Sequence, residues 1–378
     1  MLRQRIRPIT LAALIIGLAS AVHAQKSQPS PSPPKTEAQD SVRVFTEEVR
    51  LPVVALDRYG HYDPTLEMAD LLVLEDGVAQ QIRSIRRLPA YVLFLLDTGN
   101  QLGLKDTKTT GAVAVRVVSE LHDGDQIAVM QFAERPQLLQ GWTGEKAAAI
   151  KMIKTKLISG KRTRLSDALA AAADQFKNTP AGSRHIVLIT DGVESSGGQT
   201  TLTTSFKQLN SVQASVHVIS YTVLARLALQ QQAKIVKGGD RVQRDANPAS
   251  NPVANGDPRL PPGTTRTPGF RIGTIDTDLA LRRQRKEYES ATLASEAVLK
   301  EIGNESGGQT LLPATTDELL AEAENVARDI ESQYVATYRP TRPLSSAKPG
   351  EYRKIEVASR RAGLYLRSRR GYIVPNSQ

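Results

Sequence analysis

The sequence has no cysteine, only 4% aromatic residues and only five histidines among 378 residues. Without cysteine the chain cannot form disulfide bonds, which excludes a small disulfide-stabilised extracellular scaffold. Because aromatic residues are few, we expect the core to consist of Val, Leu, Ile and Ala. The histidines show no spacing typical of metal ligands. Beyond the amino-terminal region, no apolar run is long enough to cross a membrane.

The amino-terminal residues follow the order of a secretory signal peptide. Arg3, Arg5 and Arg7 precede an apolar run at residues 11–21, and small residues extend to Ala24. We therefore expect residues 1–24 to be a signal peptide that is cleaved after Ala24, and the mature protein to be secreted or periplasmic. The alternative is an uncleaved membrane anchor. The lack of cysteine is compatible with a bacterial envelope protein.

The charge of the chain is strongly positive, with a formal net charge of +10. The basic clusters at residues 282–286, 360–361 and 367–370 have no aromatic platform and no recognisable nucleic-acid-binding motif. We therefore expect no nucleic-acid partner. A solvated basic face, or contact with an anionic envelope surface, is the expected consequence of this charge.

Two β-rich segments flank the middle of the chain. Residues 25–40, which are rich in Pro, Ser, Gln and Lys, are expected to form a disordered linker. Residues 41–89 and 336–378 contain short strand patterns separated by Gly, Pro and Asp-Gly turns. Each segment is too short to bury a stable core, so we expect the two to fold together as one small β domain.

Residues 90–335 alternate between strand and helix patterns. Strands are expected at 91–96, 126–132, 185–190, 216–223 and 307–312, and helices at 107–121, 146–157, 164–176, 202–210, 290–302 and 316–334. This alternation predicts an α/β fold with a doubly wound, mostly parallel, Rossmann-like sheet. Residues 226–286, which are rich in Pro, Gly and Asn, are expected to form a flexible insertion.

Polar residues follow the predicted central strands. Asp97 comes directly after six apolar residues that read as a strand buried on both faces, and Gly99 allows a tight turn there. Thr163 precedes a predicted helix, and Asp191 follows another strand. Ligand sites of open α/β sheets lie at this edge, and two carboxylates with a hydroxyl suit Mg²⁺, Mn²⁺ or Ca²⁺. The alternative is that Asp97 only caps the following helix.

These residues resemble the metal-ion-dependent adhesion site of von Willebrand factor type A domains, which is written Asp-x-Ser-x-Ser followed by a Thr and an Asp. The resemblance covers roughly residues 90–335. The flanking sequences E-D-G-V and R-R-G-Y-I-V-P are similar to von Willebrand A-related proteins of acidobacterial type. Asp97, Thr163 and Asp191 match the motif, whereas its two serines fall on Gly99 and Gln101.

The substitutions at Gly99 and Gln101 affect the expected metal site. Gly99 has no side-chain oxygen, and Gln101 offers a neutral amide oxygen that is a common ligand only for Ca²⁺. The ligand set that the resemblance implies is therefore Asp97, Gln101, Thr163 and Asp191, binding Mg²⁺ or another divalent cation.

The resemblance implies an exported, non-enzymatic protein-binding module. In this family an acidic residue of the partner completes the metal coordination, so Asp97, Thr163 and Asp191 are also the expected partner-binding residues. The alternative is a metal-independent structural scaffold or assembly subunit of the cell envelope. A hydrolase that uses Ser183, His185 and Asp191 is the third hypothesis, disfavoured because His185 falls in a strand predicted to be buried.

Overall fold

The computed structural model describes residues 47–100, 107–180, 183–230, 279–348 and 350–374. The expected signal peptide, the expected linker, Gln101 and residues 231–278 lie outside these ranges. Within them, no helix has both the length and the apolar character needed to cross a membrane.

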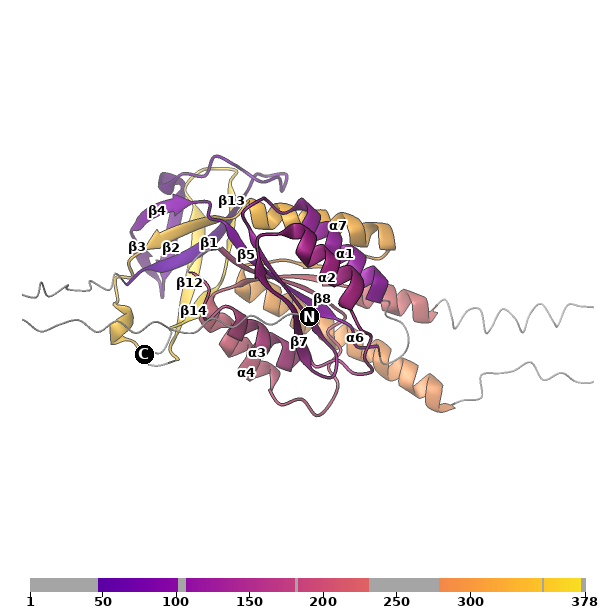
Figure 1. Cartoon of the computed structure of the whole chain (residues 1–378). Helices are drawn as coiled ribbons and strands as arrows, with labels where there is room; N and C mark the ends of the chain where they lie inside the picture. The colour runs from indigo at the N-terminus through magenta and orange to yellow at the C-terminus, as the bar shows by residue number, and fades with distance from the viewer. Residues whose placement is uncertain (1–46, 101–106, 181–182, 231–278, 349, 375–378) are drawn as a thin grey trace, which may run out of the picture. The chain divides into compact units, whose positions relative to one another are not determined.

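A six-stranded, mostly parallel sheet forms the centre of the α/β domain (Figure 1). Its order is β10 (Thr310–Leu311), β9 (Ser215–Ser220), β8 (Ser183–Thr190), β5 (Ala90–Asp97), β6 (Gln126–Phe132) and β7 (Pro136–Thr143). Only β7 is antiparallel to its neighbour. The α/β fold with a mostly parallel sheet that the sequence predicts is therefore confirmed.

Helices cover both faces of this sheet. One face packs on α1 (Thr107–Glu120), α2 (Lys146–Lys156) and α7 (Thr316–Glu331), and the other packs on α3 (Leu165–Gln175), α4 (Leu202–Val212) and α6 (Leu279–Ser306). Strand β5 contributes to both cores, because Phe94 and Leu96 belong to the first core and Leu93 and Leu95 to the second. All four are fully buried. The unbroken apolar run in the sequence thus marks a strand that is covered on both sides.

Two antiparallel sheets share a third core. One sheet has the order β13 (Tyr365–Ser368), β1 (Val49–Leu56), β11 (Tyr334–Tyr338) and β4 (Ile82–Arg86), and the other β14 (Gly371–Ile373), β12 (Tyr352–Ser359), β2 (Leu71–Glu75) and β3 (Val78–Gln80). Apolar residues from both sheets form the core between them. Each sheet combines strands from the two terminal segments, so neither segment buries its apolar side chains without the other.

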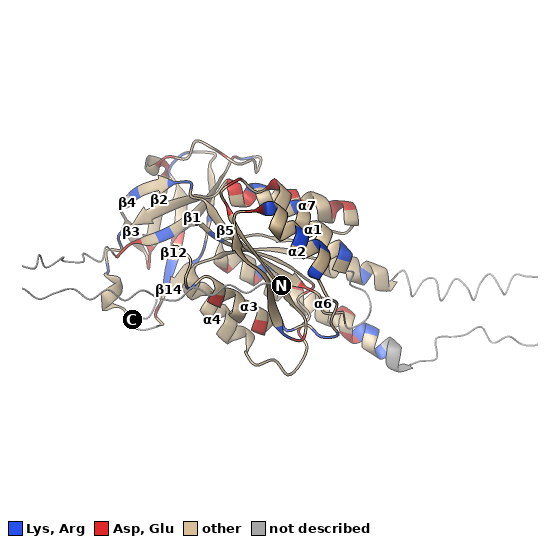
Figure 2. Cartoon of the chain, in the orientation of Figure 1, with Lys and Arg blue, Asp and Glu red and all other residues tan. Residues whose placement is uncertain are grey.

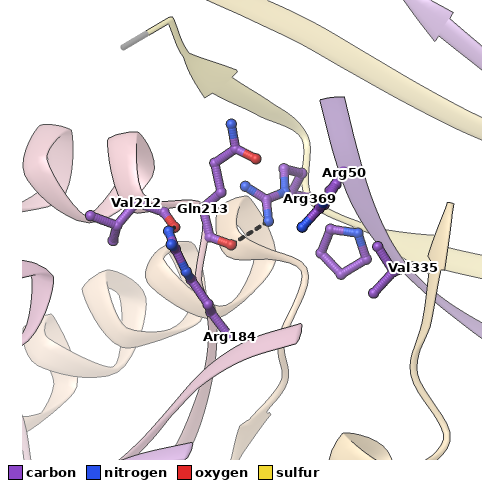
Figure 3. Close-up of a pocket in the computed structure, with 7 residues that line it drawn as sticks. Arg50, Arg184, Val212, Gln213, Val335 and Arg369 are labelled. Carbon is purple, nitrogen blue, oxygen red and sulfur yellow. Dashed lines mark hydrogen bonds between the residues drawn. The ribbon is translucent and has the colours of Figure 1, made fainter. Parts of the chain in front are cut away.

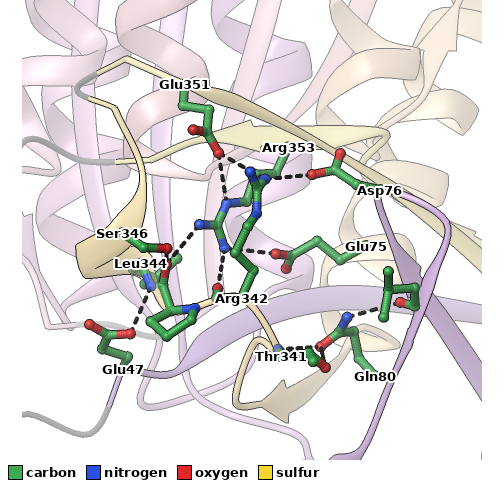
Figure 4. A network of polar contacts seen from close by, with 12 residues as sticks. Glu47, Glu75, Asp76, Gln80, Thr341, Arg342, Leu344, Ser346, Glu351 and Arg353 are labelled. Carbon is green, nitrogen blue, oxygen red and sulfur yellow. Dashed lines mark hydrogen bonds and ion pairs between the residues drawn. The ribbon is translucent and has the colours of Figure 1, made fainter.

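A buried ion pair connects these two terminal segments (Figure 4). Arg353 of β12 donates from Nη1 to Glu75 of β2 at 2.8 Å, and both side chains are almost completely buried. The hydroxyls of Tyr338 and Tyr372 donate to the second oxygen of Glu75 at 2.7 and 3.1 Å. Burial, followed by the contact with Glu75, raises the pKa of both tyrosines, so they stay protonated and donate.

Several predicted elements differ from the structure. Strand β7 was not predicted, because its half-exposed residues do not form an apolar run. The Asp76-Gly77 turn predicts a hairpin that folds back into residues 81–86, but β3 pairs with β2, and β4 joins β11 in the other sheet. The last helix was predicted to end at residue 334, but α7 ends at Glu331 and Tyr334 is the first residue of β11.

The expected insertion at residues 226–286 is wrong at both ends. Residues 222–230 are helical, and α6 already begins at Leu279. Ala225, Leu229 and Tyr288 form a small buried cluster, and Arg226 forms an ion pair with Glu296. These few apolar side chains stand among many polar residues, so the sequence pattern does not reveal them. They order the chain because they pack together in the folded protein.

Basic residues are spread over many elements rather than collected on one (Figure 2). Helices α1 and α2 carry Lys and Arg, whereas α7 carries many Asp and Glu. Arg116 of α1 pairs across the helices with Glu324 of α7 at 2.5 Å. Part of the basic surplus is therefore used in contacts within the fold.

Candidate functional site

Asp97 and Asp191 lie at the carboxyl ends of neighbouring parallel strands. Strand β5 pairs with β6 on one side and with β8 on the other, so the strand order changes direction between β5 and β8. Ligands of open α/β sheets bind at such a switch point. The structure therefore brings the two predicted acidic residues to one edge of the sheet.

The Asp97 carboxylate accepts hydrogen bonds at both oxygens. Its Oδ1 accepts from the backbone N–H of Gly99 at 2.9 Å and from the Thr163 hydroxyl at 3.2 Å, and its Oδ2 accepts from the Thr190 hydroxyl at 2.7 Å. Asp97 is 1% exposed and Thr163 is 0% exposed. Asp97 therefore joins three segments of the chain, which goes beyond capping a following helix.

Helix α6 covers Asp191. The Tyr288 hydroxyl donates to Oδ2 of Asp191, and the Ser295 hydroxyl donates to the Asp191 backbone oxygen at 2.7 Å. Oδ1 accepts from the backbone N–H of Val193 at 3.1 Å. Gly192, with a φ of 68°, makes the turn that allows this arrangement. Asp191 is fully buried.

Two tyrosines face the pair of acidic residues. Tyr221 donates from its hydroxyl to the backbone oxygen of Asp97 at 3.4 Å. Burial, followed by the charges of Asp97 and Asp191, raises the pKa of Tyr221 well above its ordinary value. The pKa of Tyr288 is raised by burial and then by Asp191 and Asp97. Both phenols therefore stay protonated and donate hydrogen bonds, and each lies within electrostatic reach of both carboxylates.

The loop between β8 and α4 forms hydrogen bonds with Thr163. Its backbone N–H donates to the Ser195 hydroxyl at 3.0 Å, and the Ser195 N–H donates to the Thr163 oxygen at 2.8 Å. Arg164, which is 6% exposed, donates to the backbone oxygen of Ser195 at 2.7 Å and also to that of Ser196. Hydrogen bonds thus connect the loop before α3 with the loop after β8, and they fix the position of Thr163.

Gly99 lies against the same loop with no room for a side chain. A Cβ atom at this position would lie 2.2 Å from the Arg162 backbone oxygen and 2.3 Å from Oγ1 of Thr163. Gly99 forms a parallel bridge with Gly160, and Asn100 donates to the Gly160 oxygen at 3.0 Å. Close backbone packing therefore fills the place where the adhesion motif has its first serine.

The described residues do not fit a complete metal-ion-dependent adhesion site. Position 99 supplies no hydroxyl and has no space for one. Each carboxylate oxygen of Asp97 and Asp191 already accepts a hydrogen bond. Across the described ranges, no group of three or more His, Cys, Asp or Glu side chains is arranged to hold a metal ion. Gln101, the fourth expected ligand, lies outside those ranges.

A cavity of about 720 Å³ opens beside Thr163 on the same edge. It lies between the β6–β7 turn, the loop before α3 and the loop after β8, with Arg135, Arg162, Asp167 and Glu134 in its lining. Arg135 and Arg162 are exposed. The acidic side chains are occupied by backbone groups, because Asp167 accepts from the N–H groups of Gln199 and Thr200, and Glu134 accepts from that of Lys161.

The hydrolase hypothesis is not supported at His185. This residue is fully buried near the start of β8, six residues before Asp191, which corresponds to roughly 20 Å along a strand. Its ring contacts Ser183 and His217, and burial lowers its pKa well below 6.5. His185 therefore has no access to a substrate and is too far from Asp191 to act with it.

Several residues that shape this site carry no recognisable signal in the sequence. Tyr288 and Ser295 lie in a charged stretch that begins inside the expected insertion, and no motif marks them. Thr190 belongs to the I-T-D-G segment, but only the pairing of β8 with β5 places its hydroxyl on Asp97. Gly160 could have been noticed as the glycine at the start of the segment that contains Thr163.

The family comparison agrees with this architecture. Residues 92–194 match the family described as von Willebrand factor type A domain. This range contains Asp97, Thr163 and Asp191. Among curated protein sequences, none matches this chain significantly.

The solved structures that are similar to this chain include bacterial and animal proteins. An aerotolerance-related membrane protein from Bacteroides fragilis is 17% identical, with 64% of this chain and 98% of that chain covered and a TM-score of 0.38. The von Willebrand domain of the type V pili tip protein Mfa5 from Porphyromonas gingivalis is 22% identical, with 29% and 40% covered and a TM-score of 0.26. Proximal thread matrix protein 1 from the mussel byssus, with a zinc-occupied adhesion motif, is 20% identical, with 35% and 36% covered and a TM-score of 0.32. Because these TM-scores lie below 0.5, no argument rests on these structures.

Proposed function

We propose that this chain, whose residues 92–194 belong to the von Willebrand factor type A domain family, is a non-enzymatic protein-binding module that binds its partner at the carboxyl edge of the parallel sheet. The observation that carries this proposal is the cavity of about 720 Å³ beside Thr163. It adjoins the switch point of the sheet, where α/β folds bind ligands.

The charges around this cavity favour an acidic segment of the partner. Neither Arg135 nor Arg162 lies within ion-pair distance of an acidic side chain among the described residues. Of the acids in the lining, Glu134 and Asp167 accept backbone hydrogen bonds, and Asp174 pairs with Lys177. The backbone N–H of Lys161 is the main cause of the lowered pKa of Glu134, and the charge of Arg162 adds to it. Guanidinium groups bind carboxylates with two parallel hydrogen bonds, so both arginines suit partner Asp or Glu side chains. Such contacts need no metal ion.

A second candidate function is cation-dependent binding through Asp97, Thr163 and Asp191. The observation in its favour is that the Thr163 hydroxyl and both carboxylates meet at one edge, and this donor set suits a hard divalent cation. A cation there would have to compete with the hydrogen bond from Tyr288 to Asp191. The closed arrangement of the described residues favours the metal-independent function.

Export to the cell envelope is part of the proposal and rests on the signal-peptide pattern of residues 1–24. It predicts that the exported protein begins near Gln25. The mass of the protein recovered outside the cytoplasm tests this, and a chain that retains Met1 would contradict cleavage.

Binding to a model acidic peptide tests the partner chemistry. A short fluorescent peptide rich in glutamate should bind the exported protein, and its glutamine counterpart should not. The double variant Arg135→Gln/Arg162→Gln should weaken binding at least about tenfold, and rising salt should weaken it further because the contacts are exposed. The matched control is Arg83→Gln, since Arg83 is an exposed arginine outside the cavity.

Two further measurements separate the alternatives. Binding that is equal in Mn²⁺ and in EDTA supports the metal-independent function, whereas loss in EDTA together with loss in Asp97→Ala supports the cation-dependent one. Equal binding by the double variant and by Arg83→Gln would contradict a role for the cavity. A scaffold that recognises no acidic segment predicts that neither peptide binds.

A further inference from the structure

A second cavity, far from the switch point in the fold, is surrounded by arginine side chains (Figure 3). It has a volume of about 40 Å³, and its lining includes Arg50 of β1, Arg184 of β8 and Arg369 between β13 and β14. Pro52, Val212, Gln213 and Val335 complete the described lining. No acidic side chain is among these described residues. Three cations from distant parts of the chain thus surround one small space.

Two of these arginines, Arg184 and Arg369, are held in place by the surrounding backbone. Arg184 donates to the backbone oxygens of Val212 at 2.8 Å and Thr179 at 2.9 Å, and Arg369 donates to that of Gln213 at 2.5 Å. Gln213 ends helix α4 with a left-handed φ of 55°. The guanidinium groups of Arg184 and Arg369 are therefore oriented by the protein itself.

The backbone at Arg369 is fixed as well. The Ser368 hydroxyl donates to the Pro52 oxygen at 2.6 Å, and the Arg370 N–H donates to the Glu305 oxygen at 3.2 Å. A Cβ atom on Gly307 would lie 2.5 Å from the Arg369 nitrogen, so α6 packs closely against this turn. This packing positions Arg369 between the antiparallel sheets and the α/β domain.

The hydrogen bonds of two of these arginines are incomplete. Among the described residues, the Nε atoms of Arg184 and Arg369 are buried and have no hydrogen-bond partner. Arg369 is 4% exposed. Burial, followed by repulsion from Arg184 and opposed by Tyr338, lowers the pKa of Arg369 to about 10. Burial and then the Arg50 charge lower the pKa of Arg184. A buried cation beside other cations is costly unless an anion compensates it.

We propose that this cavity binds a small oxyanion, such as phosphate, sulfate or a carboxylate, through Arg184, Arg369 and Arg50. A volume of about 40 Å³ exceeds the roughly 10–15 Å³ that one water needs, and it is too small for a nucleotide. The planar guanidinium group matches oxyanion geometry. The bound anion would stabilise the contact between the antiparallel sheets and the α/β domain, because its ligands come from both.

Anion binding to the whole protein tests this site. The melting temperature and the isothermal titration heat are measured with inorganic phosphate, sulfate and acetate, with NaCl keeping the ionic strength constant. We expect saturable binding of one oxyanion per chain and a melting temperature that rises with its concentration, because the ligand binds only the folded state. Acetate as the strongest ligand would identify a carboxylate site, and phosphate or sulfate a site for inorganic oxyanions.

Variants decide whether the arginines form the site. Arg369→Gln should weaken binding at least about tenfold, and Arg369→Lys, which keeps the charge but not the planar fork, should weaken it less. Arg50→Gln provides the same test if Arg369→Gln does not fold. The control is Arg360→Gln, since Arg360 is an exposed arginine outside the cavity. No saturable binding by the natural protein, or equal binding by Arg50→Gln, Arg369→Gln and the control, would overturn the proposal.

Discussion

The Thr163 hydroxyl donates a 3.2 Å hydrogen bond to Oδ1 of Asp97, which lies 66 positions earlier in the chain. This contact places two of the expected site residues together. The same carboxylate oxygen also accepts the N–H of Gly99. The backbone around Gly99 therefore fills a place that a ligating serine would need.

Restoring the serine of the adhesion motif should destabilise the protein. In Gly99→Ser, the new Cβ would collide with the Arg162 backbone oxygen at 2.2 Å, and backbone atoms cannot rotate away. We expect a loss of about 1–3 kcal/mol in the free energy of unfolding, which is typical of overpacking. Urea denaturation measures it. Gly141→Ser is the control, because a Cβ at Gly141 meets nothing within 4 Å. A stable Gly99→Ser protein that binds Mn²⁺ would show that the loop adapts to form the metal site.

Removal of the Tyr288 hydroxyl should lower the free energy of unfolding, because Asp191 loses a hydrogen bond from α6. Tyr288→Phe leaves a buried carboxylate oxygen without this donor, which costs about 1–3 kcal/mol. Tyr365→Phe is the control, because Tyr365 is 61% exposed. Urea denaturation compares the two variants. If Tyr288→Phe unfolds at the same urea concentration as the natural protein, the hydrogen bond has no stabilising role.

The ion pair between Glu75 and Arg353 should be among the most sensitive positions of the antiparallel sheets. Glu75→Ala removes the buried partner of Arg353, which keeps only its 3.3 Å ion pair with the partly exposed Glu351, and it removes the acceptor of Tyr338 and Tyr372. Breaking such a pair from one side typically costs about 3–5 kcal/mol. Glu356→Ala removes an exposed glutamate of β12 and should change stability by less than about 1 kcal/mol. Chemical denaturation distinguishes the two, and equal effects would refute the importance of the buried pair.

Acidification should destabilise the protein in two steps. Burial, followed by His217, lowers the pKa of His185 well below 6.5, so the folded protein keeps this ring neutral. The unfolded chain takes up the proton near pH 6.5, and stability is therefore lost as the pH falls below that value. The loss is at most about 1.4 kcal/mol per pH unit for this group.

The second step belongs to Asp329, which is fully buried. Burial raises its pKa, but contacts with His217, Arg367 and Tyr62 outweigh this and lower the value from 3.8 to about 2. Its contribution of about 2 kcal/mol is present above pH 3.8 and is lost as the pH falls toward 2.

Urea denaturation at a series of pH values measures both steps. His185→Gln should flatten the curve between pH 6.5 and 4.5, whereas the control His122→Gln should not, because His122 is exposed. A His185→Gln curve parallel to that of the natural protein would contradict the first step.

The α/β domain and much of its order could be predicted from the amino-acid sequence alone. The apolar run before Asp97 predicted a strand covered on both faces, and β5 contributes side chains to two cores. Alternating strand and helix patterns predicted a mostly parallel sheet. Asp97, Asp191 and Thr163 could be predicted to share one edge, because parallel strands bring their carboxyl ends together.

The contacts that these residues make could not be predicted from the sequence, because they depend on how distant elements pack. Tyr288 lies in a charged stretch, and its hydroxyl reaches Asp191 only because α6 packs on the sheet. Arg50, Arg184 and Arg369 are far apart in the sequence and meet only where the antiparallel sheets contact the α/β domain. Periodicity reports which face of an element is buried, but it carries no information on which distant side chains share a space. That depends on packing between elements, which is set by the complete fold.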